Sequence, residues 1–148
     1  MSNDNFVPFT TTRHVRDHCL CLHVRRAARA VARRFDDTLR PLDLTNGQFS
    51  LMMSLNRPKA PRMRDVSDLL AMDRTTLTAN LKPLERRGLV AVAADEADKR
   101  TRRLTLTPAG MALLARAVPI WVETEAEIEA LLGRSSPDRL RGDLSLLS

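Results

Sequence analysis

The sequence predicts a mainly α-helical protein with one small β-hairpin, an α+β fold. Apolar residues recur at intervals of three and four over most of the chain, which is the spacing of one helical face. Two short segments, 89–94 and 101–107, are instead typical of strands and enclose a polar turn. The chain has 148 residues, of which 43% are hydrophobic, so it is about one domain long and can form a core. We therefore expect a single domain over residues 1–148.

The first predicted helix runs from about His14 to Arg40, which is longer than one small domain needs. An apolar stripe extends along it, so we expect it to pack against a second copy of the chain, and we assign residues 14–42 to dimerisation. The stripe consists of Leu20, Val24, Ala27, Val31, Phe35 and Leu39.

Two shorter helices are predicted next. Thr45 and Gln48 have the spacing of a capping box, which marks the start of the first. In the second, residues 62–71, three apolar residues at i, i+3 and i+4 predict one buried face. The expected core residues are Phe49, Met52, Met53 and Leu55 in the first helix, and Val66, Leu69 and Leu70 in the second.

The following helix, residues 74–88, has two clearly different faces. Asp73 has the short acceptor side chain of an N-cap, and Gly88 stands where a helix commonly ends. At about 100° per residue, Leu77, Leu81 and Leu84 lie within about 60° of one another and face inward. Hydroxyl, methyl and cationic groups on the opposite arc are suited to base edges, thymine methyls and phosphates in a DNA major groove. These residues are Thr75, Thr78, Ala79, Lys82 and Arg86.

The two strand-like segments complete a winged helix-turn-helix, which we assign to residues 45–107. The polar sequence 95–100 forms the tip of the predicted hairpin. Cations there can reach phosphate, or a minor groove whose negative potential attracts arginine. We expect Asp98 to pair with Arg100 or Arg102 and to orient it. The cations of this wing are Lys99, Arg100, Arg102 and Arg103.

A long helix is predicted after the wing. Thr107 is its expected N-cap, Pro108 takes the first helical position, and Pro119 is an expected kink. A short helix follows from Ser136. Both carry apolar stripes, so we assign residues 108–148 to dimerisation, beside the first helix.

The net charge indicates a polyanionic partner. The chain carries 24 basic and 18 acidic side chains, for a formal charge of +6. Nearly all the cations are arginines, which bind phosphate and guanine in a forked geometry. Aromatic residues make up only 3% of the chain, which disfavours stacking on single-stranded nucleic acid, so double-stranded DNA is the expected partner.

Other classes of protein are disfavoured by the sequence. It has no phosphate-binding glycine loop, nucleophile elbow or metalloprotease motif, so we expect neither an enzyme nor a cofactor. It also lacks an apolar stretch of about 18 residues and the layout of a signal peptide, so we expect a cytoplasmic protein without a membrane partner.

The chain resembles the MarR family of bacterial winged-helix transcription regulators. The resemblance rests on four stretches and extends over nearly the whole chain. Three positions depart from the family's pattern: Ala71 stands where the turn often has glycine, Ala79 where many members have arginine, and Pro83 inside the recognition helix, where we expect a bend. The matching stretches are Asp73–Thr78, Leu84–Val90, Asp95–Arg100 and Leu104–Gly110.

The resemblance implies an intertwined homodimer that binds a pseudo-palindromic operator, with two recognition helices about 34 Å apart. It also implies a repressor that is released by a small, often aromatic, effector bound between the dimer helices and the DNA-reading head. The expected DNA-binding residues are Thr75, Thr76, Thr78, Ala79 and Lys82 in the groove, Arg74 at the helix start, Asn80 on its flank, and Asp98, Arg100 and Arg102 in the wing.

Two alternative functions remain open. Cys19 and Cys21 lie among basic residues, which are typical surroundings of reactive cysteines, so a redox-responsive regulator is an alternative, with Cys19 as the more reactive thiol and Cys21 as the packed one. An architectural protein would share the basic winged helix but show little sequence preference. His14, His18 and Cys21 share one helical arc, but three such residues are too little to predict a metal site.

Overall fold

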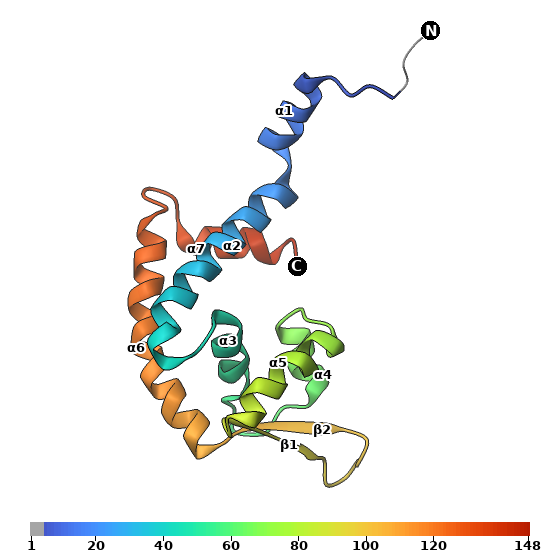
Figure 1. Cartoon of the computed structure of the whole chain (residues 1–148), viewed down its shortest axis with the longest axis vertical. Coiled ribbons are helices and arrows are strands. Elements are labelled where there is room, and N and C mark those ends of the chain that lie inside the picture. Colours follow the sequence, from blue (N-terminus) through green and yellow to red (C-terminus); the bar gives the residue numbers. More distant parts are fainter. Residues whose placement is uncertain (1–4) are drawn as a thin grey trace. The chain divides into compact units, whose positions relative to one another are not determined.

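The structure, a computed structural model, describes residues 5–148 and divides into two compact units, Met1–Arg34 and Phe35–Ser148. The expected mainly helical fold with one antiparallel hairpin is confirmed (Figure 1). The elements are α1 (Phe9–His18), α2 (Leu20–Leu39), the 3-10 turn η1 (Arg40–Leu42), α3 (Asn46–Leu55), α4 (Met63–Leu69), α5 (Arg74–Arg86), β1 (Val90–Ala94), β2 (Arg102–Leu106), α6 (Pro108–Ala130) and α7 (Pro137–Ser145).

The prediction of one continuous helix from His14 to Arg40 was wrong, because the structure has two helices there, α1 and α2. Helix α1 already begins at Phe9, and the chain leaves helical geometry at Cys19, with φ −72° and ψ 109°, before α2 begins. None of the residues described in this unit, 5–34, is buried, so no packing holds a continuous helix across the poor helix formers His18 and Cys19. The side chains of His18 and His23 instead bond the carbonyls of His14 and Cys19.

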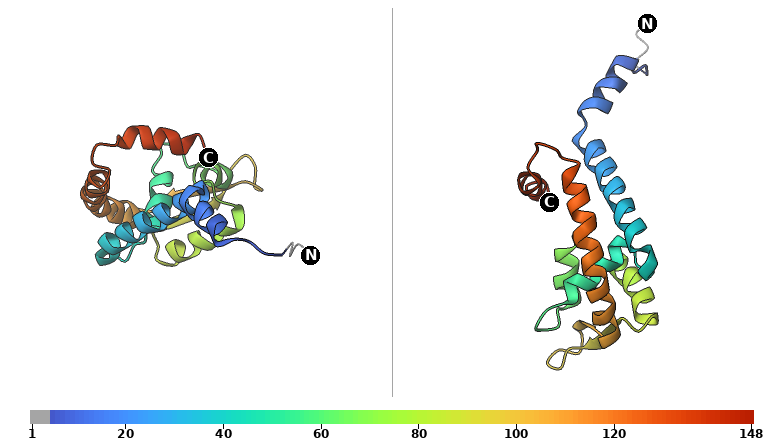
Figure 2. Two further views of the ribbon diagram at one scale, coloured as in Figure 1. Left: turned by 90° about the horizontal axis from the view of Figure 1, so that it is seen from above. Right: turned by 90° about the vertical axis from the view of Figure 1, so that its left-hand side faces the viewer.

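The second unit has its core between α3, α5, the hairpin and α6. Helix α6 packs against α3 and η1, and its N-terminal end reaches β2 (Figure 2). The inward face predicted for α5 is confirmed, because Leu77, Leu81 and Leu84 are 0%, 1% and 0% exposed. The rest of the core is formed by Leu39, Leu44, Phe49, Leu51, Met52, Leu55, Val66, Leu89, Val90, Leu104, Leu114 and Ala117.

Two residues predicted for the core are exposed instead. Met53 is 40% exposed and Leu69 is 59% exposed. In α4 the buried position is Val66, and the helix ends at Leu69, where the chain turns toward α5. Both exposed side chains border an apolar hollow, described below, that no part of residues 5–148 fills.

The predicted helix starts are confirmed in atomic detail. Thr45 and Gln48 form the capping box of α3, Asp73 accepts from the N–H of Thr76, and Thr107 accepts from the N–H of Gly110. Gly88 follows α5 with φ 70°, the left-handed geometry that glycine adopts without strain. Helix α5 continues through Pro83 to Arg86.

The hairpin is bound to two other segments. Its register pairs Val90 with Leu106 and Ala94 with Arg102. A short strand-like segment lies along the outer edge of β2, where Arg62 forms a bridge with Arg103 and the N–H of Leu104 donates to the carbonyl of Pro61 at 3.0 Å.

At its base the hairpin meets α6 at Gly110. A Cβ at this position would lie 2.0 Å from the carbonyl oxygen of Leu89, so only glycine lets the two backbones approach. Thr107 secures the same junction, because its N–H donates to Leu89 and its hydroxyl donates to the carbonyl of Gly88 at 2.6 Å. The end of the recognition helix, β1 and α6 are therefore joined at one point.

We expect Gly110→Ala to lower the free energy of unfolding by at least about 2 kcal/mol, because the added methyl meets backbone that cannot move aside. Gly142→Ala is the matched control, since Gly142 lies in α7 with open space around it, and alanine there should leave stability unchanged or raise it by up to about 1 kcal/mol. Urea unfolding of both variants measures the difference, and equal stabilities would contradict the close approach.

The turn between α4 and α5 holds a second strained position. Ala71 has φ 49°, a left-handed conformation that costs an L-residue about 1 kcal/mol relative to glycine. We expect Ala71→Gly to raise the free energy of unfolding by about 1 kcal/mol. Ala126→Gly, inside α6, should lower it by about 0.5–1 kcal/mol, and a lower stability of Ala71→Gly would show that the turn carries no strain.

Candidate nucleic-acid interface

The start of α5 is organised by its cap. The carboxylate of Asp73 accepts from the N–H of Thr76 at 2.8 Å and from its hydroxyl at 2.9 Å. These hydrogen bonds lower the pKa of Asp73 below its ordinary value. The Thr76 hydroxyl, expected in the groove, therefore donates its proton to the cap.

The outer face of α5 is exposed as expected, but its polar groups fall into two sets. The Thr78 hydroxyl donates to the carbonyl of Arg74 at 2.8 Å, and the Asn80 amide donates to the sulfur of Met72 at 3.4 Å. The side chains of Thr75 and Lys82 have no hydrogen-bond partner among residues 5–148, and Ala79 lies exposed near Lys82. The exposed candidate residues are Arg74, Thr75, Thr76, Thr78, Ala79, Asn80, Lys82, Asp98, Arg100 and Arg102.

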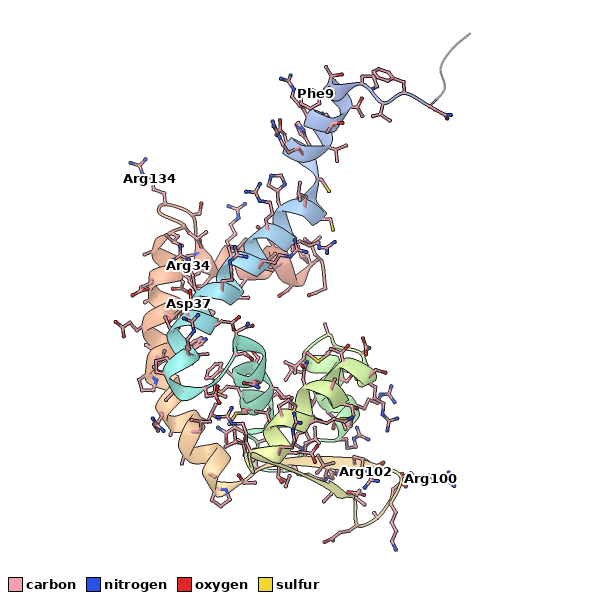
Figure 3. All side chains as sticks on the ribbon, in the orientation of Figure 1. Phe9, Arg34, Asp37, Arg100, Arg102 and Arg134 are labelled. Atoms are coloured by element: carbon pink, nitrogen blue, oxygen red, sulfur yellow. The ribbon has the colours of Figure 1, made fainter. Side chains whose placement is uncertain are left out.

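In the wing, the prediction that the Asp98 side chain pairs with that of Arg100 or Arg102 was wrong. Its carboxylate accepts from the backbone N–H of Arg100 at 3.0 Å and from the Thr101 hydroxyl at 3.1 Å, so it shapes the turn and binds neither guanidinium. The tip bends sharply at these residues, which turns the backbone donors toward the carboxylate. The side chains of Arg100 and Arg102 extend from the hairpin into solvent (Figure 3).

Arg103, predicted as a fourth cation of the wing, has a structural position instead. Its Nε donates to Asp95 at 2.8 Å and its Nη1 donates to the carbonyl of Ala60 at 3.0 Å. The two charged side chains are only 23% and 20% exposed, and the guanidinium lowers the pKa of the Asp95 carboxyl. Because Arg103 donates to Ala60, it holds the hairpin to the loop that precedes α4.

An arginine-lined hollow of about 380 Å³ lies between the starts of α4 and α5 and the wing. Arg74, Arg100 and Arg102 have no carboxylate partner among the described residues. We call this set of residues the basic hollow. It is lined by Arg62, Met63, Arg64, Ser67, Arg74, Arg100, Thr101 and Arg102.

Sequence reasoning missed Arg62 and Arg64 as members of this site. The guanidinium of Arg62 donates two hydrogen bonds to Asp65, of 3.0 and 3.1 Å, and its backbone N–H donates a third at 3.0 Å; these bonds lower the pKa of Asp65 to about 2. Because the pKa of Asp65 is lowered on folding, its ionised carboxylate stabilises the folded protein at a pH above 3.8, the ordinary pKa. This stabilisation is lost as the pH falls toward 2. The sequence signal was weak, because the start of α4 is brought beside the wing by tertiary contacts, such as the bridge between Arg62 and Arg103.

Several guanidinium groups around one hollow are suited to phosphate oxygens, which they bind through paired hydrogen bonds. Hydroxyl groups of Ser67 and Thr101 border the same space. The basic hollow therefore continues the outer face of α5 toward the wing as one polar, cationic surface.

A second hollow, of about 430 Å³, is apolar and lies between α3, the end of α4 and α6. Met53 and Leu69, the exposed residues that were predicted for the core, form part of its wall. We call it the apolar hollow. Its lining consists of Phe49, Ser50, Met53, Ser54, Leu69, Leu70, Val118 and Trp121.

The two cysteines differ from expectation. Cys21 is exposed and Cys19 is half-buried, the reverse of the predicted order. The prediction used the angles of a continuous helix, and the interruption at Cys19 changes them. The same interruption separates Cys21 from His14 and His18, and residues 5–148 contain no group of three possible metal ligands. Within that range, no helix combines the length and apolarity that crossing a bilayer requires.

Comparison with known proteins identifies the family. The model of the MarR family matches residues 44–101. The solved structure of the Mycobacterium tuberculosis transcriptional regulator MosR in complex with DNA is 39% identical, covers 88% of this chain and 93% of its own, and superposes with a TM-score of 0.79. BpsR of Bordetella bronchiseptica, whose structure concerns regulation of DNA binding by 6-hydroxynicotinic acid, is 29% identical, with a TM-score of 0.72 over 88% of this chain and 91% of its own.

A curated relative is the organic hydroperoxide resistance transcriptional regulator of Bacillus subtilis (strain 168). It is 28% identical over 101 residues, which are 68% of this chain and 69% of the relative. These proteins are transcription regulators and not enzymes. Because MosR is 39% identical and its DNA-bound structure matches 88% of this chain, the chain belongs to the MarR family of DNA-binding transcription regulators.

Proposed function

We propose that this protein is a homodimeric repressor that binds a pseudo-palindromic operator and is released by a small aromatic effector. The observation that carries the proposal is the continuous surface formed by the outer face of α5, the basic hollow and the wing. Such a surface combines groups for base edges with cations for the backbone, which is what sequence-specific duplex binding requires.

Within that surface, we assign Thr75, Ala79 and Lys82 to the major groove, because these side chains are exposed and are not used by the helix itself. Thr76 and Thr78 lie beside them with their hydroxyl protons bonded inward, so each offers an acceptor and a methyl group. Arg74 and the wing residues Arg100 and Arg102 serve the phosphates or the minor groove. Asp98 acts through the turn that presents Arg100.

Dimerisation is supported by exposed apolar side chains in both units. In residues 5–34, large apolar side chains of α1 and α2 are more than a third exposed. The second unit has further exposed apolar side chains on α6, on α7 and in the residues that follow these helices. A soluble monomer rarely leaves so many large apolar groups in water, so we propose that a second copy covers them. They are Phe9, Val15, Leu20 and Val24 in the first unit, and Val122, Leu131, Leu140, Leu144, Leu146 and Leu147 in the second.

The apolar hollow is the proposed effector site. Phe49 and Trp121 supply aromatic walls, and Ser50 supplies a hydroxyl at the edge, a combination suited to a small aromatic acid. The regulation of BpsR by 6-hydroxynicotinic acid supports this ligand class. The hollow is bordered by α6, which is also joined to the base of the hairpin at Gly110. An effector that favours one position of α6 can therefore change the position of the DNA-reading head, which is the winged helix-turn-helix.

A second candidate is thiol-based regulation. Cys19 lies at the break between α1 and α2, where its backbone is extended, and Cys21 is exposed nearby. An organic hydroperoxide would oxidise a thiol to a sulfenic acid and itself be reduced to an alcohol. The Bacillus subtilis relative, a regulator of organic hydroperoxide resistance, favours testing this reaction.

The first test is fluorescence anisotropy with duplex from upstream of the protein's own coding region and with a scrambled duplex, at two salt concentrations. We expect a preference of about 10³-fold or more for the upstream duplex, with two chains bound per site. Equal and steeply salt-dependent binding to both would favour an architectural protein instead.

We expect Arg100→Ala to weaken binding to every duplex and to reduce the slope of log K against log salt by about 0.9 for each bound chain, because one phosphate-neutralising cation is lost. The ratio between upstream and scrambled duplex should change little, since the backbone carries no sequence information. Arg116→Ala, an exposed position on α6, is the control. An unchanged slope for Arg100→Ala would remove the wing from the interface.

The effector site can be followed through Trp121, the only tryptophan of the chain. We expect 6-hydroxynicotinic acid or a related aromatic acid to quench its fluorescence and to release the protein from DNA. Leu69→Asp should abolish both effects by placing a charge in the apolar wall, and Met111→Asp, at an exposed site on α6 outside the hollow, should not.

The thiol alternative is tested with an organic hydroperoxide and the variants Cys19→Ser and Cys21→Ser. If the hydroperoxide still releases both variants from DNA, the thiol alternative is wrong.

A further inference from the structure

The loop between α3 and α4, residues 56–61, is a cationic segment that neither the recognition helix nor the wing accounts for. Its side chains Arg57 and Lys59 are exposed, and neither has a carboxylate partner within residues 5–148. Two prolines, Pro58 and Pro61, restrict the backbone on either side of Lys59. Two unpaired cations on a stiff loop lose little conformational entropy when they bind an anion.

This loop is attached to the wing. The Arg103 guanidinium donates to the carbonyl of Ala60, and the N–H of Leu104 donates to the carbonyl of Pro61, both at 3.0 Å. Pro61, which has no N–H, is buried and uses its carbonyl as an acceptor at the edge of β2. The loop and the hairpin therefore present their cations from one connected framework.

The charges of this region separate into paired and unpaired groups. Arg62 is bound to Asp65, and Arg103 is bound to Asp95. The excess positive charge is left to Arg57 and Lys59, which border a further hollow beside the loop. Its lining is Arg57, Pro58, Lys59, Ala60, Arg62, Asp65 and Arg103.

Arg62 lines both this hollow and the basic hollow, so the two adjoin. The cationic surface therefore runs without interruption from Arg74 at the start of α5, past Arg62, to the α3–α4 loop. At its two ends this surface carries unpaired cations, Arg74 at one and Arg57 with Lys59 at the other, and such cations are complementary to the regularly spaced phosphates of a duplex.

We infer that the α3–α4 loop binds the phosphate backbone of duplex DNA outside the segment covered by α5 and the wing, through Arg57 and Lys59. This inference rests on the proposed DNA-binding surface and extends it to flanking base pairs. The contact is to phosphate alone, so it raises affinity for any duplex that is long enough and leaves the choice of operator unchanged.

The experiment compares the wild type with Arg57→Ala/Lys59→Ala on upstream and scrambled duplexes. Each duplex is used at a minimal length and with both ends extended by a half-turn of DNA, over a series of salt concentrations. Arg116→Ala/Arg134→Ala is the control, since it removes the same net charge from exposed positions on and after α6, and Arg134 lies far from the wing (Figure 3). Arg57→Lys/Lys59→Arg preserves both charges, and thermal unfolding shows whether each variant folds.

We expect the wild type to bind the extended duplexes more tightly than the minimal ones, and the double alanine variant to lose this gain. On extended duplexes the variant should bind roughly 10- to 100-fold more weakly at low salt, with a salt slope smaller by about 1.8 per bound chain, or about 0.9 for each cation. The charge-preserving variant and the control should behave like the wild type.

Wild-type affinity and slope in the double alanine variant, or an equal loss in the control, would overturn the inference. The scrambled duplexes make this result independent of operator choice. If the wild type shows no preference for the upstream duplex, the proposed regulator function fails, whereas the loop contact is still decided by the salt slopes on both duplexes.

Discussion

The DNA-reading head depends on the burial of three leucines along one side of α5. Leu77, Leu81 and Leu84 are almost completely removed from water, and a helix with 3.6 residues per turn must then place Thr75, Ala79 and Lys82 on the opposite side. Rotating the helix would expose leucine side chains whose burial is worth about 1.5–3 kcal/mol each. The hydrophobic effect therefore orients the polar face, and the cap at Asp73 only determines where the helix begins.

The charges around this face differ in what they do because they differ in their partners. Arg103 and Arg62 each bind a carboxylate, and these pairs hold the wing, the α3–α4 loop and the start of α4 together. Arg100 and Arg102 have no such partner among residues 5–148 and extend into solvent. A cation already bound to a carboxylate has fewer donors for phosphate, so the unpaired arginines are the ones available to a nucleic acid.

The junction at Gly110 connects the reading head to the long helix α6. At this point the backbone of Leu89 and the first turn of α6 are closer than any side chain would permit, and Thr107 bonds both the end of α5 and the start of β1. Farther along, α6 supplies Val118 and Trp121 to the apolar hollow. In the proposed mechanism, one helix thus contacts both the effector and the base of the wing, which gives an effector a direct mechanical route to the head.

The sequence by itself determined the features that depend on residues three or four apart: the caps at Thr45, Asp73 and Thr107, the buried leucines of α5, and the left-handed Gly88. Such features depend on hydrogen bonds and periodicity within one segment, so a single segment predicts them. The tertiary structure alone decided that Asp98 binds backbone, that Arg103 is structural, that Met53 and Leu69 border a hollow, and that Arg62 and Arg64 join the basic hollow. In each of these cases the role of the side chain depends on a partner far along the chain, such as Ala60 for Arg103, or on the backbone path of a turn. The spacing of residues within one segment does not predict such partners.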